Sequence, residues 1–214
     1  MPRIRRVADG CGIAHALHFV GERWALLIVR ELLLGPKRFT DLQEGLPAAG
    51  PKVLAQRLRE LEDAGVVRRR TLPPPASSHV YELTEWGARL ETVVLELGRW
   101  GAASPAPLEG EVGPDSAMLR LRTCFAAKPA RKWTATYEMR LGRNRFGVRV
   151  ADGQLVEIFR GEPPRPDVVI DTDSTTLDHI IGGEQTLQKA VRDGRVTVTG
   201  EVRDLQRLLD ATHP

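Results

Sequence analysis

The sequence of 214 residues predicts an α+β protein made of two domains. Helical hydrophobic periodicity dominates up to residue 103, with one short β-type alternation inside it. Alternating strand patterns, accompanied by helical segments, follow residue 115. The stretch 104–114 between them is rich in Pro, Gly and small residues and has no apolar period, as expected of a linker. We therefore expect domains at 1–103 and 115–214.

The first domain is expected to contain five helices and a two-stranded ribbon. Thr40 is the predicted N-cap of the third helix, with Gln43 three residues later. Pro51 suits the first turn of the fourth helix and Gly65 its end, while Thr84 caps the last helix. In chain order, the predicted elements are helices over 13–20, 22–34, 40–45 and 51–64, strands over 66–72 and 80–83, and a helix from Thr84 to about Trp100.

The second domain is expected to be an antiparallel sheet with helices on one face. Turn signals separate its strands, as in the segments LGRN and ADG. The predicted strands are 133–141, 145–150, 154–160, 168–171 and 195–199, and the predicted helices are 115–126, 174–181, 184–192 and 201–211.

Charge and composition narrow the class of protein. The net charge of +3 is concentrated in residues 1–103, which hold 15 Lys/Arg and 12 Asp/Glu, so a polyanionic partner for that half is plausible. No apolar run reaches the ~18–20 residues that span a bilayer, and no signal peptide is evident, so we expect no membrane association and a cytoplasmic location. Cys11 and Cys124 lack metal-ligand spacing, and His15 and His18 lack a third ligand, so neither metal nor cofactor is expected.

The helix predicted over 51–64 divides into two faces. At 100° per residue, Leu54, Leu58 and Leu61 form one narrow apolar stripe. Lys52, Gln56 and Arg59 lie opposite, and Arg57 lies nearer the stripe, where it would reach a phosphate or support the fold. Such a division is what the second helix of a helix-turn-helix requires, because one face anchors it while the other enters the major groove. An amphipathic helix in any small α+β domain would show the same period.

The ribbon after this helix carries three consecutive arginines. On a strand, Arg68 and Arg70 would point to one face and Arg69 to the other. Cationic side chains on such a ribbon contact phosphates or a minor groove and add affinity that weakens with salt. The helix and ribbon together favour a winged helix-turn-helix that binds double-stranded DNA.

Residues 11–101 resemble the HxlR-type winged-helix regulators. The resemblance is carried by Cys11 and by the segments ERWALLIVRELLLGPKRFTDLQ, PKVLAQRLRELEDAGVVRRR and YELTEWG. It implies a homodimer that binds a pseudo-palindromic operator, and our principal hypothesis is that the regulator represses neighbouring genes. The DNA-contacting positions it implies are Pro51, Lys52, Val53, Gln56, Arg57, Arg69, Ser77, Ser78 and His79, to which the helical wheel adds Arg59.

The resemblance also implies dimer pairing through the first helix and the helix that ends near Trp100. The residues expected in this interface are Leu17, Leu90, Val93, Val94, Leu97 and Trp100. Some relatives use the early cysteine to sense electrophiles, which makes Cys11 a candidate redox sensor. Here the chain departs from the family, because Gly12 follows Cys11 where Pro is common.

Residues 115–212 resemble the sterol-carrier-protein-like domain. The similar segments are FGVRVADGQLVEIFRG, PDVVIDTDSTTLDHIIGG and AVRDGRVTVTGEVRDLQRLLD. The resemblance implies an apolar groove between sheet and helices for a hydrophobic effector, although the same residues could form a filled core. The expected lining residues are Met118, Leu121, Phe125, Trp133, Phe146, Phe159, Ile180 and Ile181.

No arrangement of catalytic residues is evident, so we do not expect an enzyme. Gly182 and Gly183 lack the Gly-Lys-Ser/Thr of a phosphate loop. Two hypotheses remain: a regulator that binds DNA, with or without a hydrophobic ligand, and a carrier of lipids or hydrophobic metabolites whose winged helix serves dimerisation or protein contact.

Overall fold

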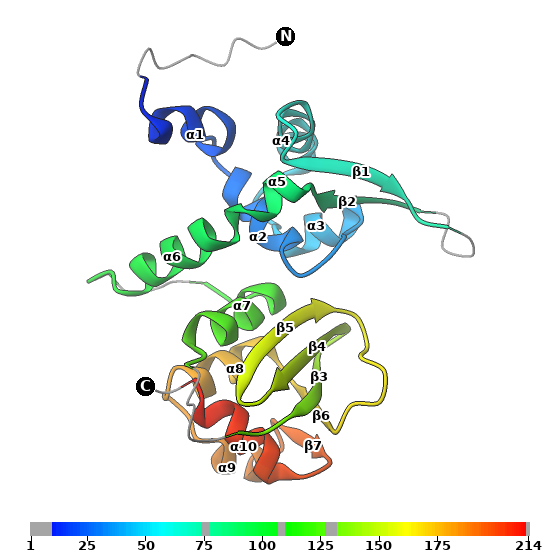
Figure 1. Cartoon of the computed structure of the whole chain (residues 1–214), viewed down its shortest axis with the longest axis vertical. Helices are drawn as coiled ribbons and strands as arrows, with labels where there is room; N and C mark the ends of the chain where they lie inside the picture. The colour runs from blue at the N-terminus through cyan, green and yellow to red at the C-terminus, as the bar shows by residue number, and fades with distance from the viewer. Residues whose placement is uncertain (1–9, 74–77, 107–109, 127–131, 213–214) are drawn as a thin grey trace. The chain divides into compact units, whose positions relative to one another are not determined.

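The computed structural model describes residues 10–73, 78–106, 110–126 and 132–212 and divides the chain into two compact units, residues 1–100 and 101–214. Each unit contains its own sheet and its own helices (Figure 1). The α+β fold class predicted from the sequence is confirmed. The two units are described separately below.

The first unit is a helical domain with a two-stranded wing (Figure 1). Its elements are α1 (Gly12–Val20), α2 (Ala25–Leu32), α3 (Phe39–Gly45), α4 (Pro51–Asp63), β1 (Val67–Thr71), β2 (His79–Leu83), α5 (Glu85–Ala88) and α6 (Leu90–Ala102). Strands β1 and β2 are antiparallel, and Arg69 lies opposite Tyr81. The backbone of Lys37 pairs with Tyr81 on the other side of β2, so the wing is attached to the segment before α3.

Two helix starts of the first unit are set differently from the sequence prediction. Helix α2 begins at Ala25 rather than at residue 22, because the Ala25 N–H bonds to the Glu22 carbonyl and Trp24 has a φ of 79°. A positive φ interrupts a right-handed helix. Helix α3 is capped at Arg38, not at Thr40, since the Arg38 N–H donates to the Asp41 carboxylate over 3.0 Å. The predicted cap at Thr84 is present, and its Oγ1 accepts the Gly87 N–H over 3.0 Å.

Gly87 holds α5 against the end of α4. A methyl group at this position would overlap the carbonyl oxygen of Val66, a backbone atom that cannot easily move. Gly98 on α6 has open space around the same position.

We expect Gly87→Ala to lower the free energy of unfolding by about 1–3 kcal/mol, the usual cost of overpacking. Gly98→Ala is the matched control and is expected to raise stability by about 0.5–1 kcal/mol, because Ala favours a helix interior. Urea titration of both variants measures the difference. Equal stability of the two would show that the contact between Gly87 and Val66 is not tight.

The second unit is a five-stranded sheet with helices. Its elements are α7 (Pro114–Cys124), β3 (Ala135–Leu141), β4 (Asn144–Ala151), β5 (Gln154–Arg160), β6 (Val168–Thr172), α8 (Ser174–Ile181), α9 (Leu187–Arg192), β7 (Thr197–Thr199) and α10 (Val202–Asp210). The strand order is β5-β4-β3-β6-β7, and β6 runs parallel to β3. The sheet is therefore mixed, and the expectation of a purely antiparallel sheet is wrong. The chain crosses over after β5 and returns beside β3, which gives a parallel neighbour.

Candidate DNA-binding face, apolar surfaces and C-terminal core

Helix α4 has the two faces that its sequence predicts. Leu54, Leu58 and Leu61 are buried in the core of the first unit. Pro51 occupies the first helical position and Gly65, with a φ of 73°, follows the last turn. Burial of the leucine stripe fixes which side of α4 remains available to a partner.

The residues of the first turn of α4 are exposed to solvent. Pro51, Lys52 and Val53 are all exposed, and Arg59 lies exposed two turns further on. Gln56 is half-buried between Arg59, which donates to its Oε1 over 2.7 Å, and Glu60, which accepts from its Nε2 over 2.8 Å. The amide is held in place by neighbours on its own helix.

Arg57 is placed differently from Lys52 and Arg59. Its guanidinium forms ion pairs with Glu60 and, over 3.4 Å, with Glu22, and only 15% of its side chain is exposed. These contacts join α4 to the turn before α2. Of the two roles that the sequence left open for Arg57, this geometry favours support of the fold.

The three arginines of the wing lie on both of its faces, as the alternation predicts. Arg68 and Arg70 donate to the two oxygens of Glu82, over 2.7 and 2.9 Å. Burial alone would raise the pKa of Glu82, but the hydrogen bonds and charges of Arg70 and Arg68 outweigh it and lower the pKa. Arg69 is exposed and makes no ion pair or side-chain hydrogen bond with the described residues. One guanidinium of the wing thus remains available to an external anion.

Two of the three polar residues expected at the wing tip are described. Ser78 accepts a hydrogen bond from Arg38 over 3.1 Å, and the exposed His79 lies 3.1 Å from the Thr71 hydroxyl. Ser77, the third, lies outside the described residues. The interaction between Arg38 and Ser78 adds α3 to the elements that position the wing.

A buried carboxylate, which the sequence did not reveal, links α2 to the segment before α3. Glu31 binds Lys37 and also accepts from Arg30 over 2.7 Å. Gly45 leaves room for the carboxylate, because a methyl group there would overlap its Oε2 and Cδ atoms. Burial raises the pKa of Glu31, but the charges and hydrogen bonds of Lys37 and Arg30 outweigh that effect, so the pKa lies below its ordinary value.

This lowered pKa predicts a pH-dependent contribution to stability. A carboxylate whose pKa is lower in the folded than in the unfolded state stabilises the fold above its unfolded pKa, about 4.3 for Glu. The contribution is lost as the pH falls through the folded-state pKa. We expect the difference in unfolding free energy between wild type and Glu31→Gln to be constant above about pH 6 and to shrink below about pH 4. Urea titrations across this range measure it, and a pH-independent difference would contradict the assignment.

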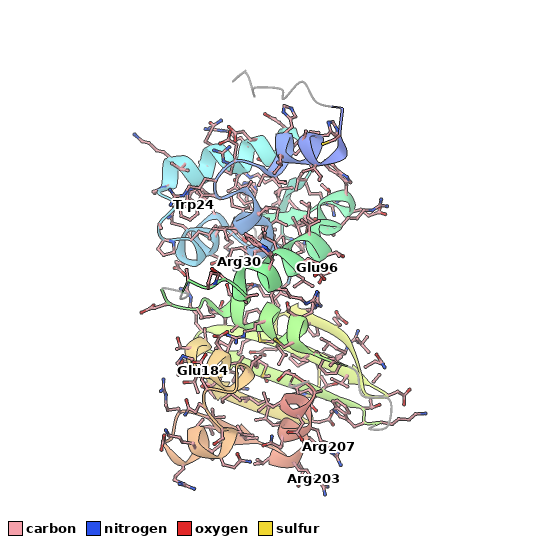
Figure 2. All side chains as sticks on the ribbon, turned by 90° about the vertical axis from the view of Figure 1, so that its left-hand side faces the viewer. Trp24, Arg30, Glu96, Glu184, Arg203 and Arg207 are labelled. Carbon is pink, nitrogen blue, oxygen red and sulfur yellow. The ribbon has the colours of Figure 1, made fainter. Side chains whose placement is uncertain are left out.

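The residues expected in the dimer interface form exposed apolar surface. None of the residues of α6 is buried, and Val93, Leu97 and Trp100 are prominently exposed, Trp100 by 77%. Leu90 and Val94 are half-buried against the core of the first unit. On α1, Leu17 is exposed together with Ile13, which the sequence analysis did not select. Glu96 projects from the same helix as Leu97 (Figure 2).

Cys11 caps the start of α1. Its sulfur accepts the Ala14 N–H over 3.3 Å, and the residue is exposed. Arg5 and Arg6, which precede Cys11 by a few positions in the sequence, lie outside the described residues.

Most of the residues expected to line a C-terminal groove lie in the core of the second unit. Met118, Leu121, Phe146, Ile180 and Ile181 are buried. The half-buried Phe125 and Trp133 lie against each other, with ring centroids 6.2 Å apart.

Phe159 does not share this core. It pairs with Gly147, and its ring occupies the space where a Gly147 side chain would be. Gly147 follows Phe146 on β4, and successive side chains of a strand point to opposite faces. The expectation that Phe159 lines one groove with Phe146 is therefore wrong.

Two polar links in this core could not be predicted from the sequence. Asp115 on α7 binds Arg160 on β5 over 2.5 and 2.6 Å. Trp133 donates to the Tyr137 hydroxyl, which donates to the Asp204 carbonyl, each over 3.0 Å. Burial raises the pKa of Tyr137 to about 12.

Neither a metal site nor a membrane span is found in the part of the chain that the structure describes. There, no three His, Cys, Asp or Glu side chains gather as metal ligands would. Among the same residues, no helix combines the length and apolarity that crossing a bilayer requires. His15 and His18 both lie edge-on to Phe19, which gives them packing roles on α1.

Helices α3 and α4, with the ribbon β1–β2, define the first unit as a winged helix-turn-helix. Residues 19–107 match the HxlR-like helix-turn-helix family, and residues 118–211 match the SCP-2 sterol transfer family. The chain is 41% identical over 85 residues to the HTH-type transcriptional regulator YodB of Bacillus subtilis (strain 168), covering 40% of this chain and 76% of YodB. It is 38% identical over 85 residues to the uncharacterized HTH-type transcriptional regulator YvaP of the same organism, covering 40% of this chain and 79% of YvaP.

The chain belongs to the HxlR-like helix-turn-helix family and carries an SCP-2 domain after it. It is a transcriptional regulator of this type, in agreement with the expectation of a DNA-binding protein rather than an enzyme. Among solved structures, the reduced form of YodB from B. subtilis matches with a TM-score of 0.41 and 36% identity, covering 47% of this chain and 100% of that chain.

Proposed function

We propose that this regulator binds a pseudo-palindromic operator in duplex DNA as a homodimer and represses neighbouring genes. The observation that carries the proposal is the division of α4, whose leucine face is buried while Lys52 and Arg59 are exposed beside an arginine-bearing wing. A helix anchored on one side and cationic on the other is suited to the major groove, and the wing to the backbone beside it.

Each exposed residue of this face is assigned a contact by its chemistry. Lys52 and Arg59 donate to guanine edges or phosphates, and Gln56 to an adenine edge once it releases its neighbours. Val53 contacts a thymine methyl group, and Pro51 sets the start of the helix. Arg57 has a supporting role. The wing contacts are assigned to Arg69, Ser77, Ser78 and His79.

Dimerisation is assigned to the apolar surfaces of α1 and α6. Exposed contiguous apolar side chains on a small domain mark interaction surfaces. In a two-fold interface, both subunits use the same surface patch. The two-fold axis also sets the distance between the two α4 helices, so that each can enter the major groove on successive turns of DNA.

The SCP-2 domain is assigned the binding of a hydrophobic effector, and residues 104–114 connect it to the DNA-binding domain. The match to this family over residues 118–211 also favours the second candidate function, a carrier of lipids or hydrophobic metabolites. A carrier would retain lipid without preferring any DNA sequence. An effector acts on DNA binding only through unequal affinity for two states of the regulator.

Cys11 is proposed as a thiol sensor because it is exposed and lies at a helix start. Mild oxidation of wild type should then change operator affinity, whereas Cys11→Ser should be insensitive to the same treatment. If oxidation changes the affinity of neither protein, Cys11 has no sensing role.

Selection of bound fragments from the host genome, followed by titration of the best fragment and a scrambled one, tests the proposal. We expect the operator to bind at least about 10³-fold more tightly than the scrambled duplex, with affinity that falls steeply as salt rises. Equal affinity for both duplexes, together with specific lipid retention by the full chain, would favour the carrier.

A further inference from the structure

A groove in the first unit lies between α1 on one side and α5 and α6 on the other. Its volume is about 180 Å³. Phe19 and Trp86 form aromatic walls, with ring centroids 5.4 Å apart in an edge-to-face arrangement. Val20, Val66 and Leu90 add aliphatic surface. The groove is far smaller than the ~300–1,000 Å³ of drug-sized sites, so it suits a compact ring system.

One charged residue, Arg89, borders this apolar groove. Arg89 is exposed, and its guanidinium makes no ion pair or side-chain hydrogen bond with the residues described. A planar guanidinium binds a carboxylate through two parallel hydrogen bonds. An apolar, aromatic-walled groove bordered by such a group is complementary to a ring that carries a carboxylate.

We propose that this groove binds a small aromatic carboxylate, with the ring against the paired side chains of Phe19 and Trp86 and the carboxylate on Arg89. Such a site is distinct from the SCP-2 domain, because every residue that lines it belongs to the first unit.

The groove borders the apolar surface assigned to dimerisation, because Leu90 belongs to both, but Leu17 of that surface points away from it. Ala16 and Phe19 line the groove, whereas Leu17 is the exposed residue between them on α1. At 100° per residue, Leu17 points about 100° away from Ala16 and about 160° away from Phe19. The groove-lining side of α1 is therefore not the side that Leu17 presents to a partner.

The floor of the groove connects a bound ligand to the DNA-binding elements. The Val66 N–H bonds to the Leu61 carbonyl at the end of α4, and the Val66 carbonyl accepts from the Thr84 N–H before α5. Val66 also directly precedes β1. A ligand against Val66 contacts the junction of α4, the wing and α5, so it can favour one arrangement of α4 and the wing over another.

The site is tested by measuring the binding of 2-naphthoate to the full chain in the absence of DNA. Calorimetry and ligand-detected NMR both report this binding. We expect 2-naphthoate to bind and the cation 2-naphthylmethylamine not to bind. Arg89→Gln should weaken binding about tenfold, the loss of a charge-assisted pair at a partly exposed site. Ala16→Leu, which fills the groove from an exposed helix position, should abolish binding. Arg99→Gln on α6 is the matched control and should bind as wild type does.

Three results would overturn the proposal. The first is equal binding of acid and amine, and the second is unchanged binding in both Arg89→Gln and Ala16→Leu. The third is binding only in a monomeric variant such as Leu97→Glu, which would show that a second copy of the chain fills the groove. Thermal melting checks that each variant is folded.

The effect on operator binding rests on the proposed function and is measured separately. Saturating 2-naphthoate should change operator affinity about fivefold or more, the usual range of coupling between two sites. If the ligand-free protein binds no operator at all, the proposed function is refuted. The calorimetric measurement without DNA would still decide whether the groove binds the ligand.

Discussion

The double variant Lys52→Ala/Arg59→Ala is expected to bind its operator about 30-fold to 10⁴-fold more weakly than wild type. Both side chains are exposed on the side of α4 opposite its buried leucines. A good contact between such a side chain and a base edge contributes about 1–3 kcal/mol, and losses at separate positions add roughly. Fluorescence anisotropy with a labelled operator at fixed salt measures the change.

The matched control for this prediction is Arg192→Ala/Arg203→Ala in the second unit. It removes the same charge from two exposed residues of α9 and α10, and Arg203 projects from α10 (Figure 2). Operator affinity should change by less than about threefold, since neither residue belongs to the DNA-binding unit and exposed charges that make no contact with DNA are largely screened by salt. If both double variants lose operator affinity equally, affinity depends only on net charge. That result would refute the assignment of α4 to the major groove.

Leu97→Glu is expected to convert the dimer to a monomer and to abolish operator binding at concentrations that saturate wild type. A two-fold interface repeats the substitution, so two carboxylates enter one apolar surface. Burying a charge without a partner is strongly unfavourable, and we expect the dimer dissociation constant to rise at least about 100-fold. Analytical ultracentrifugation across a concentration series measures this constant.

Val202→Glu on α10 controls for the introduction of a charge. Val202 is 49% exposed and Leu97 is 46% exposed, and both lie on helices. The Val202→Glu protein should sediment as wild type does and bind the operator with wild-type affinity. A Leu97→Glu protein that remains dimeric would place the interface elsewhere on the surface.

Local sequence signals predicted much of the fold. Helix α4 is an example, because its leucine spacing, Pro51 and Gly65 together determine where the helix starts, ends and is buried. The wing followed from the β-type alternation of its two strands. The positions of Lys52, Arg59 and Arg69 on exposed surface also followed, since a residue's place on a periodic element fixes its direction.

Contacts between distant residues could not be predicted in this way. Glu31 lies within an apolar run, and nothing in its neighbourhood indicates that Lys37 and Gly45 will enclose it. Asp115 and Arg160 are 45 residues apart in sequence. The parallel pairing of β3 with β6 and the position of Phe159 depend on sheet topology and register, which a strand's own period does not specify.

Helix starts were also misjudged where the backbone departs from the local pattern. The segment from Glu22 is as apolar as a helix requires, yet Trp24 adopts a positive φ and delays α2. The ion pair between Arg57 and Glu22 holds that turn beside α4. The positive φ of Trp24, beside this tertiary contact, is not a feature that hydrophobic periodicity can predict.

Hydroxyl-radical footprinting of wild type on its operator tests the central claim most directly, because it shows which DNA segments the protein covers. We predict two protected segments with centres about one helical turn, or 10 base pairs, apart or a multiple of that, and loss of both in Lys52→Ala/Arg59→Ala. Protection that is uniform along any duplex, or that persists unchanged in the double variant, would contradict the assignment of α4 to the major groove.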